Sequence, residues 1–174
     1  MPKNHRSYEK TRHIALSGLL FALAMALSFI EGSLVIPGLL PGMKLGLANI
    51  VTVFALYQLG AGAALAILLT RCLLGGLFAG NLSAMLFSVL GGLTAMLVMI
   101  FLRRLPKLSV YGVSIGGAAA HNIGQMAAAC ITLGNTMVLG YLPFLLAVSL
   151  VTGTLTGFVA GLLFRAMRNI HLSH

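Results

Sequence analysis

Arg71 is the residue of this sequence whose position most demands a chemical explanation, because it lies inside an apolar run, residues 63–79. A charge within such a run costs about 2.5–3.5 kcal/mol on insertion scales, so it normally faces other helices, water or a ligand. The chain has only two acidic residues, Glu9 and Glu31, and no aspartate. Glu31, backbone carbonyls, water or an anionic ligand must therefore meet the charge of Arg71. The structural alternative is an arginine that bonds only to backbone or extends to the interface.

A second set of polar side chains lies in residues 109–131, where His121, Asn122 and Gln125 follow a run of small residues. Residues three or four apart share a face of a helix, so these side chains can act together. They could line a ligand site, or they could join helices by hydrogen bonds worth about 0.6 kcal/mol each. We favour the ligand site. A lone histidine is weak support for a metal, and we expect no catalytic group, metal or cofactor.

Lys44 and Asn49 form a third candidate group, just after a Gly/Pro-rich loop at residues 31–42. Lys44 would open a helix over residues 43–59, with Asn49 about one turn further in. Lys44 could pair with Glu31, help Arg71 to attract an anion, or anchor the helix at the membrane interface. The spacing leaves these alternatives open.

The composition indicates that these side chains are positioned by helices in a membrane. Hydrophobic residues make up 59% of the 174 residues and charged residues only 7%, against about a quarter in soluble domains. A spanning helix needs about 20 mostly apolar residues. The sequence therefore predicts an all-α, polytopic membrane protein, one domain over residues 1–174 with a basic arm at 1–12. The six predicted transmembrane helices cover about residues 13–30, 43–59, 63–79, 82–102, 109–131 and 143–164.

The basic residues predict the orientation of this bundle. With both termini in the cytoplasm, the inner segments hold nine of the eleven lysines and arginines, as the positive-inside rule requires. The net charge of +9 is then explained by an anionic lipid surface. The basic loops have almost no aromatic residues for stacking on bases, so we expect no nucleic-acid partner.

Small residues recur at four-residue spacing in the first predicted helix, at Gly18, Ala22 and Ala26. Such spacing lets two helix backbones approach closely in lipid. The face could dock another membrane protein, or it could pack against a neighbouring helix of the same bundle. Spacing alone favours internal packing.

The segment Pro-Gly-Met-Lys-Leu-Gly-Leu-Ala-Asn at residues 41–49 resembles the signature of the bacterial Gx transporter family, also labelled heptaprenyl diphosphate synthase component I. That family is similar to the S components of energy-coupling factor transporters. The resemblance implies a six-helix, S-component-like fold in a bacterial cell membrane. It also implies docking through residues 18–26 onto a transmembrane coupling subunit driven by two ATPases. A lid that includes Glu31, Pro37 and Pro41 would cover a substrate held by Lys44, Asn49, Arg71, His121, Asn122 and Gln125.

The sequence itself argues against an enzyme. Prenyl diphosphate synthases of the usual kind hold Mg²⁺ with aspartate-rich motifs, since hard cations need oxygen ligands, and this chain has no aspartate. It has neither a phosphate-binding Walker loop nor a nucleophile elbow. We therefore expect a substrate-binding membrane component of a transporter for a small anionic molecule. The alternatives are a noncatalytic accessory subunit of polyprenyl diphosphate or quinone biosynthesis, and a purely structural subunit of a membrane complex.

Overall fold

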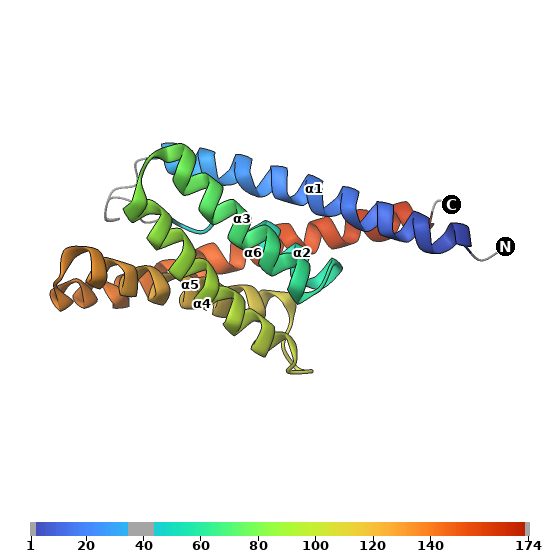
Figure 1. The fold of residues 1–174 in the computed structure, drawn as a ribbon. Helices are drawn as coiled ribbons and strands as arrows, with labels where there is room; N and C mark the ends of the chain where they lie inside the picture. The colour runs from blue at the N-terminus through green and yellow to red at the C-terminus, as the bar shows by residue number, and fades with distance from the viewer. Residues whose placement is uncertain (1–2, 35–43, 173–174) are drawn as a thin grey trace.

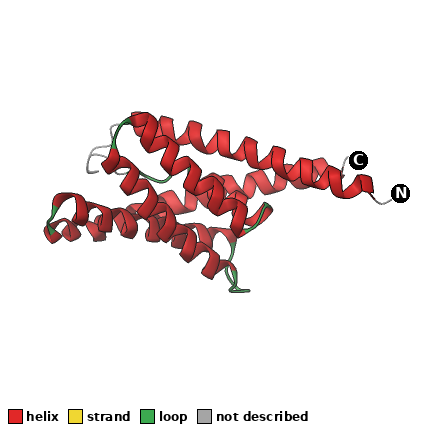
Figure 2. Ribbon diagram, in the orientation of Figure 1, coloured by secondary structure: helices red, strands yellow, loops and turns green. Residues whose placement is uncertain are grey.

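The computed structural model describes residues 3–34 and 44–172, with side chains over 7–34 and 44–167. These residues form six α-helices and one 3-10 helix, with no strand among them (Figures 1 and 2). The predicted all-α class is confirmed. The elements are α1 (Lys3–Ser33), α2 (Asn49–Gln58), α3 (Ala61–Ala79), α4 (Leu82–Arg103), α5 (Val110–Leu133), η1 (Thr136–Tyr141) and α6 (Leu142–Leu172).

The second helix is shorter than predicted. It begins at Asn49, and residues 44–48 before it are not helical, so the expectation that Lys44 opens this helix is wrong. The reason is local, because Gly46 has a φ of +86°, a conformation that helices do not contain and that glycine adopts without strain. Two other helices are longer than predicted: α1 takes in the basic arm from Lys3, and α6 continues to Leu172.

Four helical segments are long and apolar enough to cross a membrane: Ser7–Ser33, Ala61–Ala79, Leu82–Arg103 and Thr136–Met167. Helix α5 has 24 residues but is not among these four segments, and it carries the polar side chains of His121, Asn122 and Gln125. Helix α2 has 10 residues, or about 15 Å at 1.5 Å per residue, half of a bilayer core of about 30 Å. The chain is thus a multi-pass membrane protein, and α2 is the one α-helix among its described residues that is too short to span.

The two ends of the bundle differ in their connections. Figure 1 shows the start of α1 and the end of α6 at one end, toward which the α2–α3 turn and the α4–α5 loop also lie. The end of α1, the α3–α4 turn and η1 lie at the opposite end. The basic loop at residues 103–107 therefore shares an end with the basic start of α1, whereas Glu31 lies at the other end.

Helices α4, α5 and α6 pack most closely, because glycines bring their backbones together. A Cβ atom added at Gly124 would lie only 2.5 Å from the carbonyl oxygen of Leu90 on α4. One added at Gly153 on α6 would lie 2.5 Å from the Cα of Ile115 on α5. The hydroxyl of Thr94 also donates a hydrogen bond across this contact, to the carbonyl of Ala120, at 2.9 Å. Close backbone approach, which drives helix association in lipid, thus fixes the position of α5.

We expect Gly124→Ala to destabilise the protein by about 1–3 kcal/mol, because the new methyl group collides with backbone that is itself packed. Gly75→Ala is the matched control, since nothing lies within 4 Å of its Cβ position and alanine favours a helix more than glycine does. Thermal unfolding of the two variants in detergent, followed by the loss of monodisperse protein, measures the difference. Equal melting temperatures would contradict the close contact between α4 and α5.

Candidate functional site

Arg71 lies on α3, about 12 Å from the C-terminal end of the helix at 1.5 Å per residue, and is only 4% exposed. Its Nη1 donates to the hydroxyl oxygen of Ser28 on α1 at 3.0 Å. Its Nε and Nη2 have no hydrogen-bond partner among the described residues. The guanidinium group is therefore anchored on one side and has two buried donors left over.

Glu31 lies one turn beyond Ser28 on α1 and is 3% exposed. Its Oε1 accepts hydrogen bonds from the backbone N–H groups of Gly46 and Leu47, the latter at 3.2 Å. Its Oε2 is buried and has no partner in the described part of the chain. The charges of Lys44 and Arg71 both act on this carboxylate. Glu31 thus ties the segment before α2 to the end of α1.

Gln125 of α5 ties the same segment to the other side of the bundle. Its side chain accepts from the backbone N–H of Lys44 at 3.0 Å and donates to the Lys44 carbonyl at 2.7 Å. It also contacts Nε2 of His121, one turn earlier on α5. Residues 44–47 are therefore held from both sides.

Burial lowers the pKa of the Lys44 ammonium group; the charge of Glu31 opposes this shift and that of Arg71 adds to it.

We expect Gln125→Leu to release this segment, because it removes both hydrogen bonds to Lys44, each worth about 0.5–1.5 kcal/mol. Backbone amides of residues 44–48 should then exchange with deuterium faster, while those of α4 should not change. Gln58→Leu, the same substitution at an exposed position at the end of α2, is the control. Unchanged exchange in Gln125→Leu would show that Glu31 alone fixes the segment.

Two glycines make room for the cluster. A Cβ atom at Gly46 would lie 2.8 Å from Nδ2 of Asn49 and 3.3 Å from the ring of His121. A Cβ atom at Gly91 on α4 would lie 2.9 Å from both the His121 ring and the Gln125 side chain. Asn49 itself is 5% exposed, and its Oδ1 has no partner among the described residues.

The structure thus brings together five of the six predicted binding residues, Lys44, Asn49, Arg71, His121 and Gln125, with Glu31 of the predicted lid. Asn122 is directed elsewhere. Its amide nitrogen donates to the carbonyl of Leu145 on α6 at 2.8 Å, which is the interhelical bond that the sequence left as an alternative. Pro37 and Pro41 lie outside the described residues. A ligand-binding role for the cluster stays a prediction.

The small residues of α1 do not pack inside the bundle. Gly18, Ala22 and Ala26 are all exposed, and nothing lies within 4 Å of the Cβ position at Gly18. The buried face of α1 carries Leu20 and Ala24 instead. Internal packing, which spacing alone favoured, is therefore not how this face is used within the described part of the chain.

Three residues of the cluster were missed by the sequence analysis. Ser28 could have been found, since it lies three residues before Glu31 and shares its helix face. Gly46 lies within the 41–49 segment, but only its positive φ shows why a glycine is needed there. Gly91 carries no signal in the sequence, because its role depends on which helix packs against α5.

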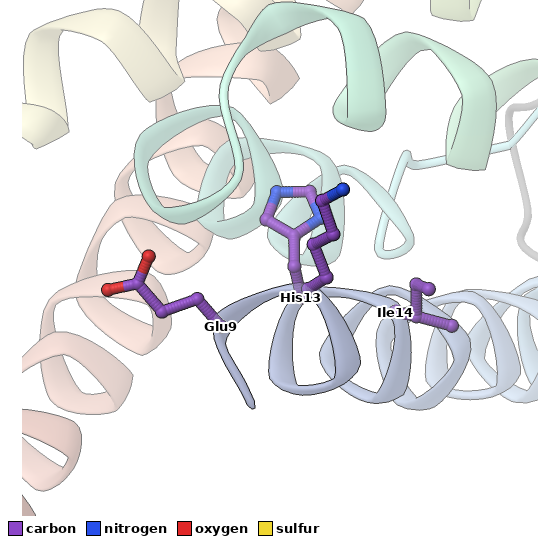
Figure 3. A pocket seen from close by; sticks show the side chains of 4 residues that line it. Glu9, His13 and Ile14 are labelled. Carbon is purple, nitrogen blue, oxygen red and sulfur yellow. The ribbon is translucent and has the colours of Figure 1, made fainter. Parts of the chain in front are cut away.

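A surface hollow of about 430 Å³ lies away from this cluster, on the N-terminal part of α1, where Glu9, Lys10, His13 and Ile14 line it. Figure 3 shows Glu9 and His13 extending from the same stretch of α1. All four side chains are exposed, and the hollow is open. It offers no buried polar group to a ligand, unlike the Arg71 cluster.

The six α-helices that the structure describes, around a buried polar cluster, define a helical membrane protein. A solved structure, described as "Structure and mechanism of the S component of a bacterial ECF transporter", superimposes with a TM-score of 0.72. The match covers 92% of this chain and 98% of that one, at 20% sequence identity, so the S-component-like fold is confirmed.

The family model described as heptaprenyl diphosphate synthase component I matches residues 20–163, and the chain belongs to this family. It is the family that the segment at residues 41–49 indicated, so that prediction is confirmed. No curated protein matches the sequence.

Proposed function

We propose that this chain is the substrate-binding membrane component of a transporter of the energy-coupling factor type, and that its substrate is a small anionic molecule. The binding residues would be Lys44, Asn49, Arg71, His121 and Gln125. Asn122 supports the site by fixing α5 to α6. The protein would catalyse no reaction itself.

The observation that carries this proposal is Arg71, a buried cation with two donors that no described side chain or carbonyl accepts. A buried charge that lacks partners is strongly unfavourable, so water or a ligand must complete it. An anion fits because Lys44 adds a second positive charge nearby. The likeness to an S component supports a substrate-binding role for the same fold.

The exposed small-residue face of α1 would dock a transmembrane coupling subunit that carries two ATPases. Its exposure supports this role, because a partner helix can reach Gly18, Ala22 and Ala26 without displacing any described residue. Both termini would be cytoplasmic in a bacterial cell membrane, with the whole chain forming one domain. The cluster of Glu31 and Arg71 would then lie in the outer half of the membrane.

Native mass spectrometry of the full chain, extracted gently from its own membrane, tests the proposal. The expected result is a retained small molecule, a complex with a coupling subunit and ATPases, or both. If monodisperse protein shows no bound molecule and no such complex, the proposal is contradicted.

The description of the family favours one alternative, a noncatalytic accessory subunit of polyprenyl diphosphate or quinone biosynthesis. In that case the same spectra would show a bound polyprenyl chain or a prenyl synthase subunit. The polar cluster argues against a hydrocarbon chain at this position, since an apolar ligand would offer no partner to Nε and Nη2 of Arg71 or to Oε2 of Glu31.

A further inference from the structure

The buried atoms without partners include both hydrogen-bond donors and hydrogen-bond acceptors. Together they define the chemistry of the ligand more closely than charge alone. Arg71 offers the donors Nε and Nη2, whereas Glu31 and Asn49 offer the acceptors Oε2 and Oδ1. All three side chains are at least nine-tenths buried. Among the described residues, none of these four atoms has a partner.

The three side chains belong to one continuous set of contacts. Arg71 bonds to Ser28, and Ser28 lies three residues before Glu31 on α1, on the same helix face. Glu31 accepts from the N–H of Gly46, and Gly46 lies against the side-chain amide of Asn49. One run of contacts between α1, α3 and the start of α2 therefore links the side chains that carry the free donors and acceptors.

The two free nitrogens of Arg71 form one edge of the guanidinium plane, because Nη1 is the nitrogen used by Ser28. Two parallel N–H groups on one edge match the two oxygens of a carboxylate or a similar planar anion. An anion alone would not complete the site, since its oxygens would face Glu31 Oε2 and Asn49 Oδ1, which are acceptors. The molecule must also present a hydrogen-bond donor beside its anionic group.

The charges set a further condition. The cluster contains two basic residues, Arg71 and Lys44, and one acidic residue, Glu31, so its formal net charge is +1. A ligand with a single negative charge neutralises it. A diphosphate brings more negative charge than the cluster can balance, and it brings only acceptors when fully ionised.

Resting on the proposed substrate-binding function, we infer that the ligand is a small monoanionic organic acid that carries a neutral N–H or O–H donor next to its carboxylate. The carboxylate would bind to the free edge of Arg71. The donor would bind to Glu31 Oε2 and Asn49 Oδ1. Lys44 would supply the remaining positive charge.

The test is native mass spectrometry of the full chain in detergent, incubated with the small-molecule fraction of the cells that express it. The molecule released from the protein is weighed in H₂O and in D₂O, which counts its exchangeable hydrogens. We expect one acidic group and at least one further exchangeable hydrogen. A diphosphate, a multiply charged acid or a molecule without a second exchangeable hydrogen would overturn the inference while leaving a binding function in place. No bound molecule at all would overturn both.

Glu31→Gln locates the donor contact. The glutamine oxygen can still accept from Gly46 and Leu47, but its NH₂ group then faces the donor of the ligand. The fraction of Glu31→Gln protein that carries the molecule should fall, by an amount that corresponds to an affinity roughly tenfold or more below that of the wild type. Glu9→Gln is the matched control, because Glu9 is exposed and lies outside the cluster. Monodisperse Glu31→Gln protein with unchanged occupancy would overturn the placement of the donor at Glu31.

Discussion

Replacing Arg71 by leucine is expected to lower the affinity for the molecule that co-purifies with the wild-type protein by about a hundredfold or more. Two hydrogen bonds between charged groups are lost, each worth about 1.5–3 kcal/mol, and every 1.4 kcal/mol is a factor of ten. The fraction of protein that carries the molecule, measured by native mass spectrometry over a range of concentrations, gives the change in affinity.

The same variant separates a binding role from a structural one. Among the described residues Arg71 has one hydrogen bond, to Ser28, and two buried donors without partners. An apolar side chain in place of such a buried charge is often neutral or stabilising. Arg71→Leu should therefore leave the melting temperature of the empty protein unchanged or raised. A clear decrease in that melting temperature, with binding unaffected, would show that Arg71 serves the fold.

Two further variants control this result. Arg71→Lys keeps the charge but loses the planar edge with its two donors, so its affinity should lie between those of the wild type and Arg71→Leu. Arg104→Leu makes the same change in charge and side-chain type at an exposed position beyond α4, where binding should not change. Equal binding by Arg71→Lys and the wild type would remove the argument for a bidentate contact.

The fold could be predicted from the sequence because membrane helices depend on local composition. Long apolar runs and the loops between them lie close together in sequence, so most helix positions followed from counting residues. The exception is residues 44–48. Their apolar side chains read as the start of a helix, but the backbone turns at Gly46 and is held by Glu31 and Gln125. Both partners come from other helices, and no local pattern contains them.

The candidate site could be predicted only in part, for a related reason. Arg71, Glu31 and Gln125 stand out as polar groups in apolar surroundings, which is a property of each residue alone. Which of them meet depends on how helices pack. Asn122 and Gln125 are three residues apart, yet Asn122 bonds to α6 and Gln125 to the segment before α2. The rotation of α5 about its own axis determines which partner each side chain meets. Close contacts such as the one at Gly124 fix that rotation.

A second large effect is expected from substitutions on the outward face of α1. Ala22→Leu combined with Ala26→Leu should abolish co-purification with a transmembrane coupling subunit, because two bulky side chains prevent the close approach that small residues allow. Both positions are exposed, so the leucines add bulk outside the bundle and should leave folding and ligand occupancy unchanged. Affinity purification of the full chain from its own membrane, followed by mass spectrometry of the partners, measures the loss.

Ala127→Leu makes the same kind of change at an exposed position on α5, away from α1, and should keep the complex intact. If the α1 double variant still co-purifies with the coupling subunit, the docking surface lies elsewhere. If both variants lose it, added bulk anywhere on the lipid-facing surface is disruptive and the effect is not specific to α1. Loss in the double variant alone, with its bound small molecule retained, would separate docking from substrate binding, since Ala22 and Ala26 lie on the outward face of a helix whose inward face carries Ser28 and Glu31.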